Sequence, residues 1–299
     1  MKVFYSDTFD LNLPDNHRFP GSKYGMLRRT LLENDILAED MLEASQPIDD
    51  AALLRAHAPE YVASIDHGTI DDKAMRRIGF PWSRHIALRA RATMGGALAA
   101  ARAALQDGLS GQLAGGTHHA HYDFGSGYCV FNDFAVTALA LLNEKNVDRV
   151  AIIDLDVHQG DGNAALLSPR DDVFVLSVHG EKNFPFRKMT SDLDLNLPDG
   201  VEDEEYNAAL CGVLPAIWEF KPDLVLYQAG VDPLKEDRLG RMALTYNGLM
   251  QRDRLVLSMC KKRGIPVSMA IGGGYTDPIA QSVAAYANTW RAAKEIWGF

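Results

Sequence analysis

Cysteine is scarce in this chain of 299 residues, and its spacing matches none of the usual cysteine patterns. The three cysteines, Cys129, Cys211 and Cys260, are far apart and include no C-x-x-C pair. This arrangement argues against a disulfide framework and against a cysteine zinc site, and it favours a reducing compartment. We therefore expect a cytoplasmic protein.

Long apolar runs and clusters of basic residues are missing as well. No apolar stretch approaches the length that spans a bilayer, and the first residues lack the basic and then apolar pattern of a signal peptide. The largest basic cluster is Lys261-Lys262-Arg263, in a chain with a formal net charge of −10. Nucleic-acid binders usually present a basic face, so we expect neither a nucleic acid nor a membrane as partner. The acidic balance mildly favours cationic partners.

The sequence also lacks the signs of a boundary between domains. No linker-like tract, internal repeat or block of like charges divides it. Its hydrophobic content of 47%, with 23% charged residues, is ordinary for a globular enzyme. We expect a single domain over residues 1–299. The sequence carries no signal for the oligomeric state.

Apolar strand patterns alternate with helical patterns along the chain. A long alanine-rich helix is predicted over 84–106, and Asn132 is predicted to cap a helix that runs to Asn143. Alternating strands and helices are typical of a parallel sheet with helices on both faces, so the predicted fold class is α/β. The predicted strands are 150–153, 173–178, 224–228 and 267–271, and the other predicted helices are 203–218, 245–263 and 278–297.

Polar residues follow the apolar strand 150–153 in the segment Asp154-Leu-Asp156-Val-His158-Gln-Gly-Asp161. In open α/β sheets ligands bind beyond the carboxyl ends of the strands, and alternate residues of an extended backbone point the same way. Asp156 and His158 are therefore placed to converge on one ion, and a carboxylate with an imidazole suits zinc, iron or manganese. The alternative is a polar turn that opens a helix, with Asp161 or Asn163 as its cap.

Three further segments carry chemically active side chains at similar positions. His118 and His119 are adjacent in a glycine-rich loop, and Asp232 follows the strand 224–228. Tyr275 follows three glycines after another strand, and such glycines let the backbone pass close to a ligand. Four such motifs on one sheet indicate one site.

In this order the motifs resemble the zinc-dependent histone deacetylase family, and most closely its bacterial and class IV branch. The resemblance rests on the Gly-Gly-x-His-His loop at 115–119, on Tyr128-Cys-x-x-Asn132-Asp133, and on the early element His57-Ala-Pro-Glu-Tyr61. It covers most of the chain. It implies a mainly parallel eight-stranded sheet of arginase-like topology, with the site in loops at one edge.

The resemblance also implies the roles of individual residues. Asp156, His158 and Asp232 match the ligands of one catalytic zinc ion, and Fe²⁺ is the alternative ion. Three protein ligands leave room for water and for a substrate carbonyl. His119 matches the general base that later acts as general acid, and His118 its electrostatic and orienting partner.

Three more residues complete the implied chemistry. Asp154 and Asp161 match acids that accept hydrogen bonds from His118 and His119, respectively. Tyr275 matches the tyrosine that donates to the developing oxyanion. A structural K⁺ site is implied by the resemblance alone, at Asp154, at the backbone of Asp156 and His158, and at Ser177 and Val178.

The implied substrate channel has aromatic walls. Tyr128 and Phe184 match the pair of rings that hold an acyl-lysine chain, although Phe186 lies only two residues beyond Phe184. Gly127 is the small residue beside this channel, and such residues leave room for the acyl group. The remaining histidines, His121 among them, are expected to be structural.

The implied function is removal of acyl groups, acetyl first, from lysine-like amines. Longer acyl-lysine and acetylated polyamines are alternative substrates. A binuclear manganese ureohydrolase is a more distant alternative, because that family uses Asp-x-His-x-Asp. Here the second residue after His158 is Gly160 and the aspartate comes one residue late, at Asp161. The second metal ion would lack its bridging ligands.

Overall fold

The computed structural model describes residues 1–14 and 17–299, and its centre is an eight-stranded sheet in the order β2-β1-β3-β8-β7-β4-β5-β6. Every pair of neighbouring strands is parallel. The strands are β1 (Val3–Tyr5), β2 (Leu42–Ala44), β3 (Leu109–Gln112), β4 (Val150–Asp154), β5 (Val173–Gly180), β6 (Leu193–Leu197), β7 (Leu224–Gln228) and β8 (Val267–Ala270).

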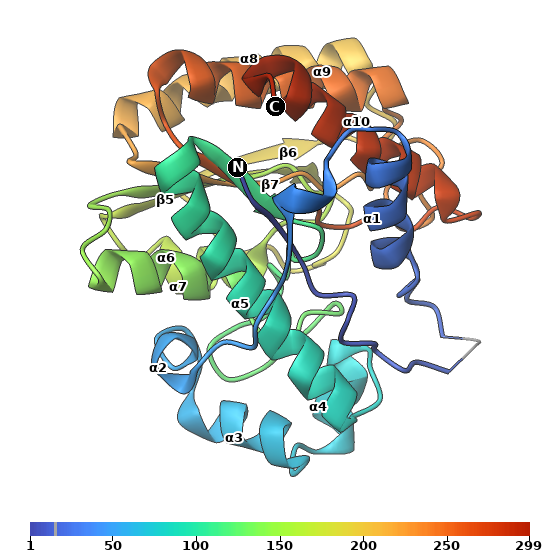
Figure 1. Cartoon of the computed structure of the whole chain (residues 1–299), viewed down its shortest axis with the longest axis vertical. Coiled ribbons are helices and arrows are strands. Elements are labelled where there is room, and N and C mark those ends of the chain that lie inside the picture. Colours follow the sequence, from blue (N-terminus) through green and yellow to red (C-terminus); the bar gives the residue numbers. More distant parts are fainter. Residues whose placement is uncertain (15–16) are drawn as a thin grey trace.

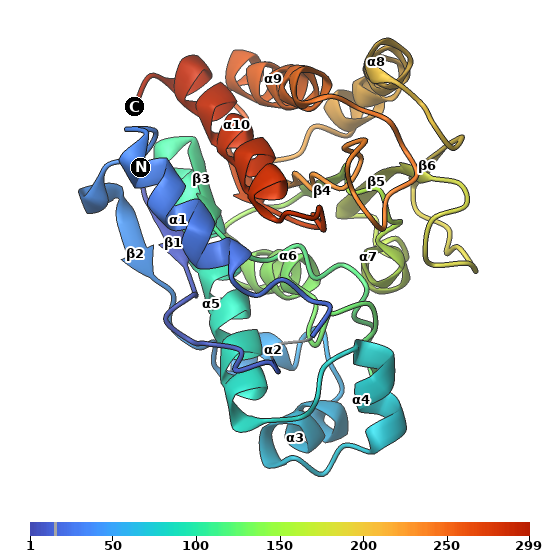
Figure 2. The same cartoon turned by 90° about the vertical axis from the view of Figure 1, so that its right-hand side faces the viewer.

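Helices cover both faces of this sheet (Figure 1). They are α1 (Lys23–Glu33), α2 (Asp50–Leu53), α3 (Pro59–His67), α4 (Asp72–Ile78), α5 (Arg84–Asp107), α6 (Asp133–Asn143), α7 (Asp161–Leu167), α8 (Asp203–Phe220), α9 (Tyr246–Arg263) and α10 (Ala280–Trp297), with a short 3₁₀ helix at Glu39–Met41. Figure 2 shows α8, α9 and α10 on one side of the sheet, and α6 and α7 on the other. The short helices α2, α3 and α4 lie beyond the sheet, near one end of α5.

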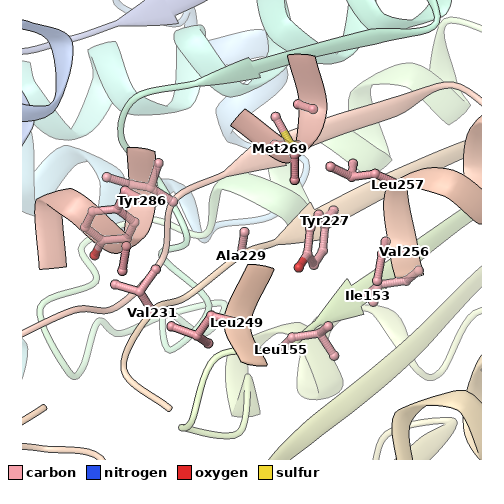
Figure 3. Close-up of a cluster of buried hydrophobic side chains, with 14 of the residues drawn as sticks. Ile153, Leu155, Tyr227, Ala229, Val231, Leu249, Val256, Leu257, Met269 and Tyr286 are labelled. Carbon is pink, nitrogen blue, oxygen red and sulfur yellow. The ribbon is translucent and has the colours of Figure 1, made fainter. Parts of the chain in front are cut away.

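The central strands are apolar throughout because both of their faces are buried. Ile153 of β4 belongs to the core under α9 and α10, and its neighbour Ile152 belongs to the core on the opposite face. Figure 3 shows the first of these cores, in which Tyr227 and Met269 lie near Val256 of α9.

The predicted α/β class and the eight-stranded parallel sheet are confirmed. The predicted strand 224–228 coincides with β7, and the predicted long helix 84–106 ends one residue short of α5. Asn132 caps α6 as expected, since its side chain accepts a 2.9 Å hydrogen bond from the backbone N–H of Ala135. Within the described residues, no helix is both long and apolar enough to cross a membrane.

Candidate active site

Four loops that follow adjacent strands meet over one pocket of about 330 Å³. The loop after β3 brings His118 and His119, and the loop after β4 brings Asp156 and His158. Asp232 follows β7, and the glycine segment that ends at Tyr275 follows β8. The carboxyl ends of parallel strands lie at the same edge of a sheet, which is why residues so far apart in sequence share one pocket.

Asp156, His158 and Asp232 form a buried group of metal-ligand type at the centre of this pocket. One ligand atom of each residue lies within 4.8 Å of the other two. His158 Nδ1 is 3.0 Å from Asp156 Oδ1 and 3.1 Å from Asp232 Oδ2. These separations are close to the edge of about 3.3 Å expected between ligands in a tetrahedral zinc site. The donor set and its geometry therefore fit one divalent ion.

The pKa shifts of this group also favour a bound cation. Burial and the neighbouring charge of Asp156 raise the pKa of Asp232 to about 7. Burial alone would lower the pKa of His158, but hydrogen bonds to Asp156 and Asp232 raise it to about 10. Two carboxylates in a dry pocket favour a proton on the imidazole between them, and a bound divalent cation would take the place of that proton.

Glycines let the loop after β8 approach both carboxylates. The backbone N–H of Gly273 donates a 2.7 Å hydrogen bond to Asp156 Oδ2. A Cβ atom on Gly273 would lie 1.9 Å from Asp232 Oδ2, so no larger residue fits there. The N–H of Val157 donates to Asp232 Oδ1 at 2.9 Å, which fixes the second carboxylate.

The tandem histidines lie beside this group, and each is held by its own carboxylate. His118 Nδ1 is 2.8 Å from Asp154 Oδ2, and His119 Nδ1 is 2.6 Å from Asp161 Oδ1. The two rings are 4.0 Å apart between centroids. In each residue the Nδ1 atom is taken by the carboxylate, which leaves Nε2 for the pocket.

The two histidines have opposite pKa shifts. Burial and the neighbouring His118 lower the pKa of His119 to about 4. Burial also acts to lower the pKa of His118, but Asp154 and Asp156 outweigh it and raise the value to about 9. Near neutral pH the tandem pair therefore consists of a neutral imidazole at His119 and an imidazolium at His118.

Tyr275 lines the same pocket. Burial and the charges of Asp156 and Asp232 raise the pKa of its phenol well above the usual range, so the hydroxyl keeps its proton. Its backbone N–H donates a 2.6 Å hydrogen bond to Asp237 Oδ2. The ammonium group of Lys23 lies 4.9 Å from the centre of its ring.

The family model of the histone deacetylase domain matches residues 17–290. The chain belongs to the histone deacetylase family. It is a hydrolytic deacetylase enzyme, and the predicted family membership is confirmed.

Relatives of bacterial and plant origin match nearly the whole chain. An uncharacterized protein of the cyanobacterium Picosynechococcus is 42% identical over 99% of both chains. Histone deacetylase 2 of Arabidopsis thaliana is 28% identical over 95% of this chain and 77% of its own length. The crystal structure of a histone deacetylase homologue in complex with SAHA superposes with a TM-score of 0.84. That homologue is 27% identical, and the match covers 100% of this chain and 84% of the homologue.

The predicted channel residues of this deacetylase line the pocket next to His119. The ring of Phe184 packs edge-on against the His119 ring with 4.9 Å between centroids. Gly127 permits this contact, because a Cβ atom there would lie 2.6 Å from His119 Cδ2. Tyr128 has a positive φ of 65°, a strained conformation for a residue with a side chain. Phe186 is 88% exposed and also lines the pocket.

Several residues that position the site were not predicted from the sequence. His121 lies 3.1 Å from Asp161 through its Nε2, so Asp161 bonds two histidines rather than one. Asp133 accepts backbone N–H bonds from Gly116 at 2.7 Å and Thr117 at 3.0 Å and so shapes the histidine loop. The Tyr-Cys-x-x-Asn-Asp motif contained Asp133, but the contact to the loop had no signal in the sequence.

The residues of the predicted K⁺ site are also close together. Asp154 of β4 and Ser177 of β5 are direct partners in the sheet register, and Val178 follows Ser177. Ser177 Oγ lies 2.9 Å from His179 Nδ1. Asp154 additionally bonds His118, which links this corner of the sheet to the catalytic pocket.

Proposed function

We propose that this chain removes acyl groups from lysine-like amines by adding water to the amide carbonyl at a single divalent metal ion. The observation that carries the proposal is the buried group of Asp156, His158 and Asp232 beside two histidine–aspartate pairs. The two buried carboxylates would hold a divalent cation, and the paired histidines would transfer protons.

Zinc is the first candidate for this ion, with Fe²⁺ as the alternative, because two carboxylates and one imidazole suit either. When bound, the ion would lower the pKa of a bound water and polarise the substrate carbonyl. A structural K⁺ ion at Asp154, Ser177 and Val178, with the backbone of Asp156 and His158, is part of the same proposal. A second catalytic ion of the ureohydrolase kind lacks support, because Asp161 is already bonded to His119 and His121.

His119 is proposed to take a proton from the attacking water and later to give it to the leaving amine. Its lowered pKa keeps Nε2 unprotonated before the reaction, while Asp161 holds Nδ1–H and stabilises the imidazolium that forms. His118, held by Asp154, is proposed to be its electrostatic and orienting partner. This division of roles is the one that the family resemblance implies.

Tyr275 is proposed to donate a hydrogen bond from its hydroxyl to the carbonyl oxygen as negative charge develops on it. The contact strengthens in the transition state, which is the requirement for catalysis. Asp237 is proposed to position Tyr275, because it accepts a hydrogen bond from the backbone N–H of that residue.

The substrate side of the proposal is a lysine side chain lying between Tyr128 and Phe184. The mouth of the pocket favours a peptide over a polyamine. Lys182 and Arg241 line this mouth and share one carboxylate, Asp199, at 3.8 Å and 3.3 Å. An acetylated polyamine would bring a second positive charge to this basic rim. We rank acetyl-lysine peptides first, longer acyl-lysine second and acetylpolyamines third.

The cellular setting of the proposal follows the sequence. We propose that residues 1–299 act as one catalytic domain in the cytoplasm, without a nucleic-acid or membrane partner. Three free cysteines, two of them buried, agree with a reducing compartment.

A substrate panel tests the proposal. Zinc-loaded and Fe²⁺-loaded protein would be assayed for release of free amine from acetyl-lysine peptides, acetylputrescine, arginine and simple amine-free amides. We expect the highest kcat/KM with an acetyl-lysine peptide, and a further gain when acidic residues flank the lysine. Faster hydrolysis of arginine or of amine-free amides than of any acyl-lysine would contradict the proposal.

A further inference from the structure

A second, smaller cavity adjoins the active-site pocket. It has a volume of about 50 Å³, and five residues line both spaces, Phe19, Tyr24, Gly115, Thr117 and Tyr128. A volume of this size holds one or two water molecules or a group as small as a carboxylate, and it excludes a long aliphatic chain.

Most of the wall of this small cavity is apolar, but Arg89 of α5 also lines it. Arg89 is 5% exposed, and its guanidinium lies 4.4 Å above the ring of Tyr24. One of its nitrogens donates a 3.2 Å hydrogen bond to the carbonyl oxygen of Phe9. Across residues 1–14 and 17–299, no carboxylate forms an ion pair with Arg89. Burial lowers the pKa of its guanidinium, and Asp7, whose charge acts weakly against that shift, is bonded to Arg28 instead. A buried positive charge thus faces the cavity without a counter-charge from the described chain.

Two hydroxyl groups join Arg89 at this cavity. Tyr24 lines it, and burial raises the pKa of its phenol to about 12, so the group stays a donor. Thr93, one helical turn beyond Arg89, also lines it and is buried. Neither hydroxyl forms a hydrogen bond with another described residue. A small cavity with a guanidinium and two free hydroxyls in an apolar wall has the chemistry of an anion site.

The position of the cavity selects the kind of anion. A lysine side chain enters past Phe184 and Phe186, so its amide nitrogen lies on the side of the mouth. With the amide at the metal-ligand group, we place the acyl group toward Tyr24 and Gly115, which line both the pocket and the Arg89 cavity. A negative group at the far end of a short acyl chain would reach the guanidinium.

We propose that the Arg89 cavity binds a carboxylate at the end of the acyl group, so that short dicarboxylic acyl-lysines such as succinyl-lysine are substrates. This inference rests on the proposed deacylase function and extends it to the acyl side. The reaction itself is unchanged: water adds to the acyl carbon, the C–N bond breaks, and the amine leaves with a proton. The products are the peptide with its unmodified lysine side chain and the dicarboxylate.

The test compares two peptides that differ only in charge, succinyl-lysine and succinamoyl-lysine. For the wild-type enzyme we expect kcat/KM to be about 10-fold to 100-fold higher for the succinyl peptide, the usual gain from a hydrogen-bonded charge. Malonyl-lysine and glutaryl-lysine peptides would show which chain length matches the distance. In Arg89→Gln the ratio should fall to about 1.

Two further variants keep the result interpretable. Arg102→Gln removes an exposed arginine from the same helix, which is paired with Glu144, and should leave the ratio as in the wild type. Tyr24→Phe removes one donor with little change of shape and should lower the ratio several-fold, which covers the case in which Arg89→Gln does not fold.

The outcomes separate this inference from the proposed function. If no acyl-lysine peptide is hydrolysed, the deacylase proposal itself fails. If acetyl-lysine is hydrolysed but succinyl-lysine is no better than succinamoyl-lysine, only the carboxylate site fails. Inhibition by free acetate that weakens in Arg89→Gln, without succinyl hydrolysis, would assign the cavity to the product and overturn the proposal.

Discussion

Two buried clusters of charged side chains lie close together in this molecule, and they differ in how their charges are balanced. One cluster is Arg252 and Asp253 of α9, and the other is the group of Asp156, His158 and Asp232. Both are almost completely buried. The first satisfies its charges within the protein, whereas the second places two carboxylates against one imidazole.

The cluster on α9 is structural. Asp253 accepts hydrogen bonds from Arg252, Tyr227 and Thr289, which use both of its oxygens. Arg252 also donates to the carbonyl oxygens of two residues that precede metal-site residues, Leu155 and Gly230. Arg252 thus holds the backbone of the loops after β4 and β7 through these hydrogen bonds.

A structural ion pair and a binding site differ in whether each buried charge has a partner within the protein. In a structural pair each charge has a partner, and removing one partner leaves the other unpaired. In a binding site the unequal number of buried positive and negative side chains indicates the charge of the ligand that would bind there. The Arg89 cavity follows the same logic with the opposite sign of charge.

The largest expected effect comes from Asp232→Asn, which should abolish both metal retention and turnover. The metal-free variant should nevertheless unfold at a higher temperature than metal-free wild type, because one of two repelling buried carboxylates is gone. Metal analysis, activity and calorimetry of the metal-free proteins check this. A lower unfolding temperature would make Asp232 a structural residue like Asp253.

Asp253→Asn should have the opposite signature. Leaving Arg252 buried and unpaired should reduce the free energy of unfolding by about 3–5 kcal/mol. Denaturant titration measures it, and Asp172→Asn, on the exposed pair with Arg170, is the matched control with little expected effect. Equal stabilities of the two variants would remove the distinction between the clusters.

Tyr275→Phe should keep the fold and the metal and lower kcat by about 10²-fold to 10³-fold, the usual loss for one oxyanion donor. The ring and its contact with Lys23 remain, so only the hydroxyl is tested. Steady-state kinetics on an acetyl-lysine peptide give the answer. A kcat within a few-fold of wild type would reduce Tyr275 to a packing residue.

The smallest expected effect is the contribution of the buried His57, which has no carboxylate partner among the described residues, to the pH dependence of stability. Burial lowers the pKa of His57 from 6.5 to about 4, and its ring bonds the carbonyl oxygen of His121 and the N–H of Asn132. Between these pH values the unfolded chain binds more protons, so this contribution is complete above pH 6.5 and lost as the pH falls toward 4. It amounts to about 3 kcal/mol.

Unfolding measured from pH 7.5 to pH 4.5 tests this linkage. His57→Gln, which can keep both hydrogen bonds, should lose less stability on acidification than the wild type. His85→Gln, at an exposed position, should behave as the wild type. Identical pH slopes for all three proteins would exclude a role for His57.

The sequence predicted the parts of the fold that carry strong local patterns. Strands β4 and β7 are continuous apolar runs, and α5 is a long alanine-rich helix, so their patterns are unambiguous. Strands β1 and β3 have only three and four residues, and β3 reads Leu-Ser-Gly-Gln. Such short strands exist because their neighbours in the sheet pair with them, and the eight-stranded sheet was predicted only through the family resemblance.

The candidate site shows the same division. The residues of the motifs were identified from their positions after strands, and the structure brings them into one pocket. Asp237, Lys23 and Arg89 lie in segments without a motif, and their contacts with Tyr275 and Tyr24 depend on tertiary packing. The overall acidic charge also gave no sign of the basic mouth formed by Lys182 and Arg241.

We propose that the buried carboxylates of Asp156 and Asp232 mark a site for one catalytic divalent ion. Elemental analysis of the purified protein, combined with activity before and after chelation, tests it most directly. The account predicts about one zinc or iron ion per chain, loss of activity on chelation and recovery when one equivalent is returned. Two equivalent ions per chain, or full activity in the metal-free protein, would contradict it.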